Sequence, residues 1–240
     1  LAWLFGGLMG GDLITGFYIT GLVGLVFIDR LLAREYREQG VTQAVQAQSL
    51  LESHLENRVA LLNGVTSLIE TSGTADVNEE GVARFTRRVF SDLADVRAVA
   101  YADARGFVRA VFPRAGWGRL RSGTNLRDSV DIAPALDEAR FTRVAAATRT
   151  MPVAPGERGV VLVEPVLRDG RVTGYTTAAI SYRPLFADAL GGRLRGRFAY
   201  QVRDDSLRVI ARSPAFTTAF TAIERRYVRL PGSHRWAVDV

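Results

Sequence analysis

The sequence predicts an α+β protein, with an N-terminal membrane helix and a long stalk helix ahead of two antiparallel-sheet units in tandem. Three observations predict this order: an apolar run at the start, a helical pattern of apolar residues without proline after it, and β-hairpin patterns in two separate parts of the remainder. We expect a membrane helix at 1–29, a stalk at 30–72, a first sheet unit at 73–190 and a second, truncated sheet unit at 191–240.

Residues 1–28 are apolar apart from one charge, Asp12, and they contain several glycines. A helix needs about 20 mainly apolar residues to cross a bilayer, and glycine is commoner in membrane helices than in soluble ones. Because a carboxylate at the bilayer centre costs about 3 kcal/mol, we expect Asp12 to lie near an interface. Three arginines follow the run, and the positive-inside rule taken alone would place the rest of the chain in the cytoplasm.

The stalk pattern places apolar residues at helical spacing from Ala44 to Ile69, with charged residues on the other face. We expect this stripe to pack on a domain or on the same helix of a second copy, and the stalk therefore predicts a homodimer. His54 falls outside the stripe, and we expect it to be a solvated surface residue.

The first sheet unit shows the order helix, hairpin, glycine-rich loop, short helix and three more strands, which is a PAS-like order. This pattern predicts a five-stranded antiparallel sheet with helices at one side. We expect a helix at 82–93, strands around 97–103 and 107–113, a helix at 132–142, a strand at 143–153 and a hairpin at 159–181.

The second sheet unit repeats the hairpin pattern in "RFAYQVRDDSLRVIARS". A helical stretch near residues 215–226 follows, and then two strands, "YVRL" and "WAVDV". Because the chain begins with Leu1 and its last strand pattern stops at Val240, we expect it to be a fragment of a longer protein.

Composition weighs against several classes of function. The formal net charge is +6, but all the basic residues are arginines dispersed among 25 acidic residues, so no basic stripe indicates nucleic-acid binding. The chain has no cysteine, and its two histidines, His54 and His234, lie far apart, so we expect no metal site. We find no spaced acid and base pair and no activated nucleophile, so we expect neither a cofactor nor an enzymatic activity in this fragment.

Three segments resemble the CHASE domain: "GTNLRDSVDIAPALDEA", "GERGVVLVEPV" and "GYTTAAISYRPLFADAL". They are similar to the family's Gly-x-x-Leu loop, its Gly-Val-Val strand that ends in Pro-Val, and its glycine-started strand that runs into a helix. The resemblance implies an extracytoplasmic, small-molecule-sensing domain of a membrane-bound histidine kinase or a diguanylate or adenylate cyclase. It also implies an inner-membrane or plasma-membrane location and an output domain beyond Val240. We give it more weight than the arginines beside the apolar run.

A PAS-like pocket would lie between the sheet and the loop and helix that cover it. In "TGYTTAAIS", Tyr175, Thr177 and Ala179 alternate with Thr176, Ala178 and Ile180, so one face carries the core and the other can face a ligand. Thr148 matches a threonine that contacts ligand in members of the resembled family. The candidate ligand-binding residues are Tyr101, Asp103, Trp117, Thr148, Met151, Glu164, Tyr175 and Thr177.

Plainer interpretations stand beside some of these candidates. Asp103 is explained more simply as a turn former, and Tyr101 is either a core residue or a lid over the pocket. Glu164 interrupts an apolar strand and is explained more simply by solvent exposure or by pairing with an arginine. The alternative function for the chain is a membrane-tethered cytoplasmic regulatory or nucleic-acid-binding module, which the arginines after the apolar run favour.

Overall fold

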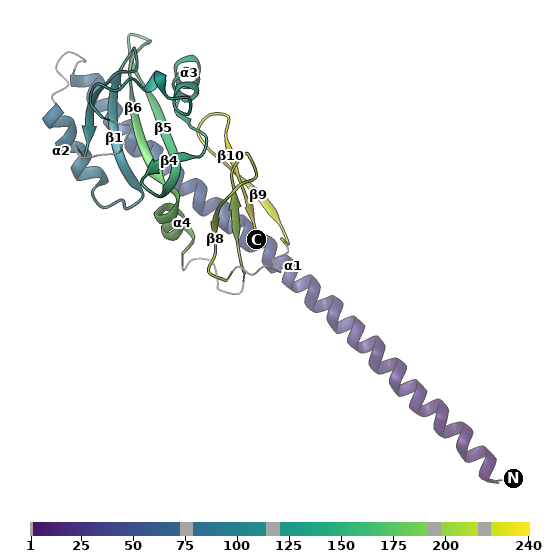
Figure 1. Ribbon diagram of the computed structural model, residues 1–240. Helices are drawn as coiled ribbons and strands as arrows, with labels where there is room; N and C mark the ends of the chain where they lie inside the picture. The colour runs from purple at the N-terminus through teal and green to yellow at the C-terminus, as the bar shows by residue number, and fades with distance from the viewer. Residues whose placement is uncertain (1, 73–78, 114–120, 192–197, 216–221) are drawn as a thin grey trace. The chain divides into compact units, whose positions relative to one another are not determined.

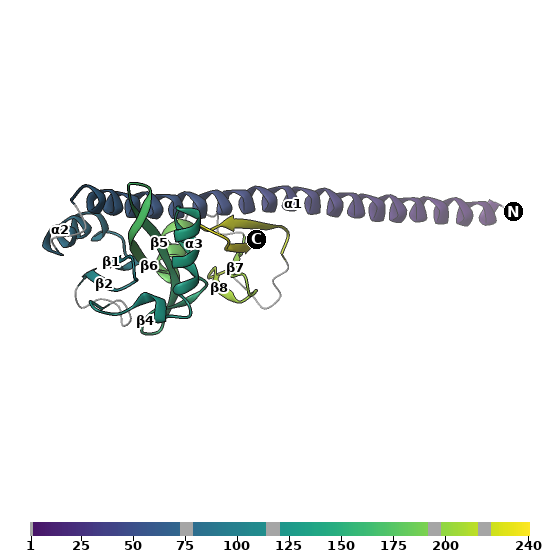
Figure 2. The ribbon, with the colours of Figure 1, turned by 90° about the horizontal axis from the view of Figure 1, so that it is seen from above.

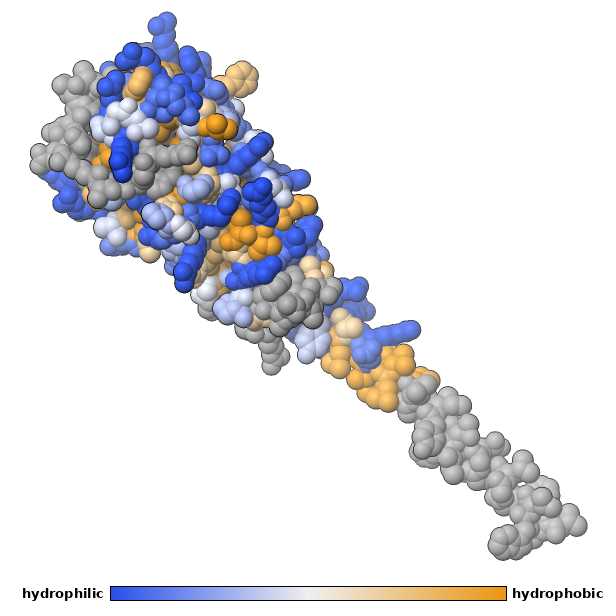
Figure 3. Space-filling model, viewed as in Figure 1, coloured by the Kyte–Doolittle hydropathy of each residue, from blue (hydrophilic) through white to orange (hydrophobic). Residues whose placement is uncertain are grey.

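The computed structural model describes residues 2–72, 79–113, 121–191, 198–215 and 222–240. The chain forms two compact units, Leu1–Thr42 and Gln43–Val240, which are described separately. The first unit is the N-terminal part of helix α1 (Ala2–Ser72). Figure 3 shows an apolar stretch on its surface. The exposed large apolar side chains here are Val23, Leu25, Val26, Phe27, Ile28, Leu31 and Leu32, and Tyr36 follows them. Within the described ranges, no helix combines the length and the apolar character that a bilayer crossing requires.

The second unit contains two antiparallel sheets, and the larger one has six strands (Figure 1). Its strands are β1 (Val96–Asp103), β2 (Val108–Phe112), β3 (Ala146–Ala147), β4 (Met151–Ala154), β5 (Glu157–Arg168) and β6 (Arg171–Ser181). The order is β2-β1-β6-β5-β3, with β4 also paired to β5. The predicted β5–β6 hairpin is confirmed. Its turn places Asp169 and Gly170 at φ 50° and 71°, the left-handed pair that a two-residue hairpin turn needs.

The sheet has six strands rather than five because the strand expected at 143–153 is divided in two. The hydroxyl of Thr148 accepts a hydrogen bond from the Val161 amide at 2.9 Å, a place that a backbone carbonyl would occupy in a regular ladder. The chain then leaves β5 at Arg149 and pairs with it again from Met151. A threonine side chain thus interrupts the ladder.

Helices cover both faces of this sheet, whereas the sequence predicted helices at one side. Residues 43–72 of α1 and helix α4 (Tyr182–Leu190) pack on one face, and α3 (Ala133–Thr142) packs on the other (Figure 2). The remaining helical segments are α2 (Glu79–Phe90), which contacts β2, and the 3-10 turn η1 (Leu126–Asp128). The two faces have separate apolar cores because successive side chains of a strand point in opposite directions.

The smaller sheet has four strands in the order β8-β7-β10-β9. They are β7 (Gln201–Arg203), β8 (Val209–Arg212), β9 (Arg225–Arg229) and β10 (Arg235–Asp239), and they confirm the predicted hairpin and the two last strands. Of the helical stretch expected at 215–226, residues 216–221 lie outside the described ranges, and Arg225 already belongs to β9. Trp236 packs edge-on against Phe186 and Tyr182 of α4, which joins this sheet to the helix.

A buried ion pair attaches α1 to the larger sheet. The guanidinium of Arg58 donates two hydrogen bonds, of 2.9 and 3.0 Å, to the carboxylate of Asp95, and both residues are 2% exposed. His54, one turn earlier, is not a solvated residue as expected, because its ring is largely covered and lies 3.5 Å from Asp188 of α4. The apolar stripe of α1 therefore carries a charged contact that its periodicity did not indicate.

Candidate ligand-binding site

The alternation predicted for β6 is confirmed. Tyr175 and Ala179 belong to the core beneath α3, while Ala178 and Ile180 belong to the core beneath α1. Thr176 also faces α1, because its hydroxyl lies 2.5 Å from that of Thr66. The predicted ligand-binding residues consequently divide between two faces of the larger sheet.

Three of the predicted residues are buried, namely Met151, Tyr175 and Thr177. Two of them, Met151 and Tyr175, lie in the core beneath α3. The Tyr175 hydroxyl accepts a long hydrogen bond of 3.3 Å from the Arg127 guanidinium. The Thr177 hydroxyl lies 3.5 Å from the carbonyl of Ala100 on β1, the limit of a hydrogen bond. These hydroxyls are therefore weakly satisfied polar groups in an otherwise apolar layer.

Arg127 is a residue that the sequence reasoning missed. It lies in η1, next to Asn125, whose side-chain oxygen accepts a hydrogen bond from the Arg127 amide and so begins the turn. Its guanidinium donates to Asp137 of α3 at 2.7 Å, and this contact raises the pKa of Arg127 above its ordinary value. The signal that could have found it is its place in the "GTNLRDS" loop, where a cation can meet the covering helix and β6.

Thr148 lies at a second place, a polar cavity of about 230 Å³ between the β3–β4 segment and the smaller sheet. Its hydroxyl is already engaged, since it accepts from the Val161 amide and donates to the Arg149 carbonyl. Across the cavity, His234 Nδ1 pairs with the Asp205 carboxylate. The residues that line this cavity are Asp131, Thr148, Arg149, Thr150, Val160, Asp204, Asp205, Ser206, Arg208, Leu230, His234 and Trp236.

Tyr101, Asp103 and Glu164 lie away from the layer beneath α3. Tyr101 belongs to the core on the α1 side, and burial raises the pKa of its hydroxyl. Asp103 accepts hydrogen bonds from the amides of Arg105 and Phe107, the pattern of a turn former. Glu164 is half-buried against α1 and does not pair with an arginine among the described residues. Trp117 lies outside the described ranges.

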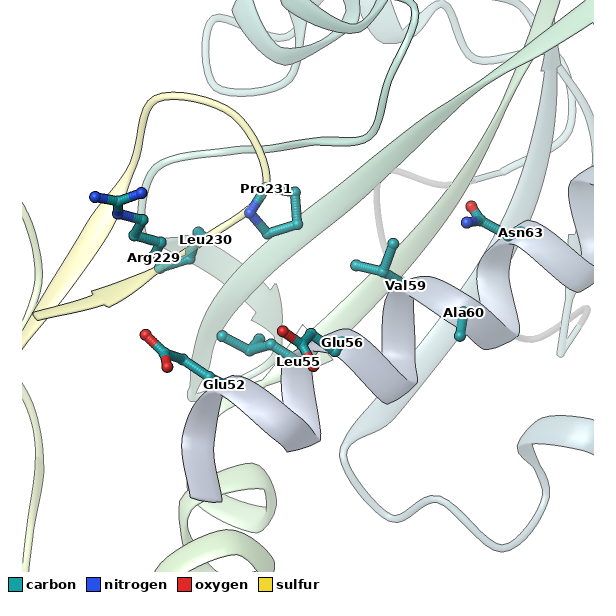
Figure 4. Close-up of a pocket in the computed structure, with 9 residues that line it drawn as sticks. All are labelled: Glu52, Leu55, Glu56, Val59, Ala60, Asn63, Arg229, Leu230 and Pro231. Carbon is teal, nitrogen blue, oxygen red and sulfur yellow. The ribbon is translucent and has the colours of Figure 1, made fainter. Parts of the chain in front are cut away.

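A groove of about 540 Å³ that no sequence pattern indicated runs between α1 and the β9–β10 turn (Figure 4). Leu55 and Val59 of α1 and Leu230 and Pro231 of the turn supply its apolar surface. Figure 4 shows the Arg229 guanidinium directed away from the helix. The polar or small residues that complete the lining are Glu52, Glu56, Ala60, Asn63 and Arg229.

Comparison with known proteins rests on structure. No protein-family model matches the sequence, and no curated protein matches it. The ligand-binding domain of the Pseudomonas aeruginosa amino-acid chemoreceptor PctC, solved with GABA, superposes with a TM-score of 0.57 at 18% identity, over 84% of this chain and 97% of that one. The sensory domain of the Campylobacter jejuni chemoreceptor Tlp3, solved with isoleucine, gives 0.63 at 11% identity, over 88% and 94%.

The chain shares its fold with ligand-binding domains of chemoreceptors. The Pseudomonas fluorescens chemoreceptor CtaA with L-valine repeats the match, with a TM-score of 0.60 at 15% identity over 88% of this chain and 97% of that one. These neighbours are PAS-like sensor domains, which agrees with the order of elements predicted from the sequence. At such identities the likeness concerns the arrangement of helices and strands and carries no ligand from those proteins to this one.

Proposed function

We propose that this chain is the extracytoplasmic ligand-sensing domain of a membrane-bound signal-transduction receptor. The observation that carries the proposal is a fold shared, over more than four fifths of the chain, with several receptor domains that were solved with a small molecule bound. The apolar run of residues 1–28 supports attachment to the inner or plasma membrane. The weakly satisfied polar groups beneath α3 support ligand binding as the task of this chain.

The ligand belongs, in this proposal, to the larger sheet unit and to its α3 face. Tyr175 and Thr177 offer two hydroxyls whose present hydrogen bonds are long, and Arg127 offers a cation that already pairs with Asp137. Met151 offers an adaptable apolar wall. A ligand with an acceptor group and an apolar part, such as an α-amino acid, fits this chemistry. Thr148 would contribute through the backbone it holds rather than through its engaged hydroxyl.

The resemblance to the CHASE family supports the finer parts of the proposal. On that basis the output domain beyond Val240 is a histidine kinase or a nucleotide cyclase, and the receptor is a homodimer that associates through the stalk. A ligand can shift such a receptor only if it binds one of two states more tightly than the other. The contacts of α1 with both sheets make the stalk the element that such a shift would move.

Isothermal titration calorimetry of the full chain in detergent tests the proposal, with a panel of the L-amino acids and GABA as probes. We expect at least one probe to bind, and Thr177→Val or Arg127→Gln to weaken it tenfold or more. Each lost hydrogen bond to a buried ligand group leaves that group unpaired, which is a penalty of about 1–3 kcal/mol.

The matched control is Thr176→Val, the same substitution one residue earlier on the opposite face of β6. It should leave the affinity unchanged, while circular dichroism confirms that every variant is folded. If no probe binds to the folded chain, amino acids are excluded as its ligands. If a probe binds and Thr176→Val weakens it as much as Thr177→Val, the α3 face is the wrong location.

A further inference from the structure

A line of polar side chains crosses the apolar contact between α1 and the larger sheet. Asn63, Thr66 and Glu70 follow one another at spacings of three and four residues, so they share one side of the helix. The Thr66 hydroxyl lies 2.5 Å from that of Thr176 on β6, and Glu70 Oε1 accepts a hydrogen bond of 2.7 Å from the Leu167 amide on β5. The apolar residues that surround this line on α1 are the buried Leu62, Val65 and Ile69.

Glu164 of β5 meets this line at Asn63. When the Asn63 amide is turned so that its NH2 group faces β5, its nitrogen lies 3.1 Å from each oxygen of the Glu164 carboxylate. An ionised carboxylate accepts hydrogen bonds only, and so it needs the NH2 group. A protonated carboxyl also donates, and can then be matched by the amide oxygen after the amide turns over. Asn63 can therefore satisfy Glu164 in either protonation state.

The charges around Glu164 favour its protonated state. The titratable group that acts on it from α1 is Glu70, a second carboxylate, while Asn63, Thr66 and Thr176 are neutral. Arg168, on the same strand, donates to the backbone carbonyl of Glu70 and does not pair with Glu164 among the described residues. Burial, together with the charge of Glu70, raises the pKa of Glu164 to about 7.

The two protonation states therefore differ in how well α1 fits the sheet. In the protonated state Glu164 brings no charge to the contact, and there is no repulsion between Glu164 and Glu70. Ionisation introduces both, because the carboxylate must lose hydration at the helix–sheet contact and face a like charge. We expect the contact to tighten as Glu164 takes up a proton and to loosen as it releases one.

We propose that Glu164 and Asn63 form a proton-operated contact, by which pH near neutrality changes how tightly α1 is held against the β5–β6 hairpin. This inference goes beyond ligand sensing and does not depend on it. It gives the same stalk a second input, the pH, which acts on the α1 side of the sheet and not at the proposed ligand site beneath α3.

Amide hydrogen exchange of the full chain in detergent, measured by mass spectrometry between pH 5.5 and 8.5 and corrected for intrinsic exchange rates, tests the proposal. The folded-state pKa of Glu164 lies above its ordinary value, so the folded protein holds the extra proton and stability falls as pH rises towards 7. For one proton, the protection of amides in residues 62–69 and 164–167 should fall by up to about tenfold per pH unit in that window.

Glu164→Gln, a neutral copy of the protonated carboxyl, should remove this fall and keep the protection high at pH 8. Glu157→Gln is the matched control, because Glu157 lies on the same strand but pairs with Arg97 at 2.6 Å, and it should retain the fall. A slope in Glu164→Gln equal to that of the unaltered chain overturns the proposal.

A second measurement needs no variant to fold. In the chain labelled with carboxyl-¹³C glutamate, one side-chain resonance should titrate between pH 6 and 8, and its midpoint should differ from the ordinary glutamate range. If every glutamate carboxyl titrates below pH 5.5, the contact is not operated by protons near neutrality and the proposal fails.

Discussion

Replacement of Arg58 by methionine tests whether the buried ion pair holds α1 on the larger sheet. The side chains of Arg58 and Asp95 are each 3% exposed, and two hydrogen bonds of 2.9 and 3.0 Å join them. Arg58→Met leaves the Asp95 carboxylate buried without a cation, which typically lowers the free energy of unfolding by about 3–5 kcal/mol. The 3.7 Å approach of Arg58 to Asp188 adds little, since the Asp188 side chain is 62% exposed.

The assay is thermal and urea unfolding of the full chain, followed by circular dichroism. For a domain of this size, 1 kcal/mol shifts Tm by about 2–4 °C, so Arg58→Met should lower Tm by roughly 6–20 °C. The control is Arg97→Met, which breaks a still shorter pair with Glu157, but one whose side chains are each about one third exposed. We expect this control to cost below about 1 kcal/mol.

The double variant Arg58→Met/Asp95→Leu separates the buried charge from the lost contact. Once both charges are removed, no uncompensated carboxylate remains, and most of the lost stability should return. Two results would refute the reasoning: a loss in Arg58→Met no larger than that in Arg97→Met, or a double variant no more stable than the single one.

Two further predictions concern packing. Trp236→Ala should lower the free energy of unfolding by about 3–5 kcal/mol, measured as a urea midpoint, because the ring is 2% exposed and packs edge-on against Phe186 and Tyr182. The exposed Tyr227→Ala on the adjacent strand should cost far less, and equal losses would contradict this assignment of the core. Gly159→Ala should destabilise by about 1–3 kcal/mol or more, because the added Cβ would lie within 2 Å of the Ile180 carbonyl oxygen. The control is Gly156→Ala, where the added Cβ meets no other part of the chain within 4 Å, and both variants are compared by melting temperature. An equal loss of stability in the two variants would mean that backbone conformation, and not crowding, dominates.

The elements of the second unit follow from local patterns. The alternation in "TGYTTAAIS" predicted which residues of β6 share a face, and the strand–turn–strand pattern of residues 159–181 predicted the hairpin. The helical spacing from Ala44 to Ile69 predicted the buried side of α1. These properties depend on neighbours within a few residues, and such neighbours are written in the sequence.

The predicted site residues show where local patterns stop. Tyr101 and Tyr175 both follow an alternating pattern, yet they belong to opposite faces of the sheet, because the face of one strand relative to another depends on how the strands pair. Arg127 becomes a candidate only when η1, α3 and β6 are brought together, and no spacing in the chain encodes that contact.

The sequence by itself determined the kinds of elements, their order and the side of each that is apolar, because periodicity and turn chemistry are local. Only the tertiary structure decided that helices cover both faces of the sheet, that Arg58 meets Asp95, and that Glu164 meets Asn63 and Glu70. The two side-chain pairs and the Glu164–Glu70 repulsion involve residues 37 to 101 positions apart. Their charge states are set by burial and by neighbours from other elements, and both exist only once the chain has folded.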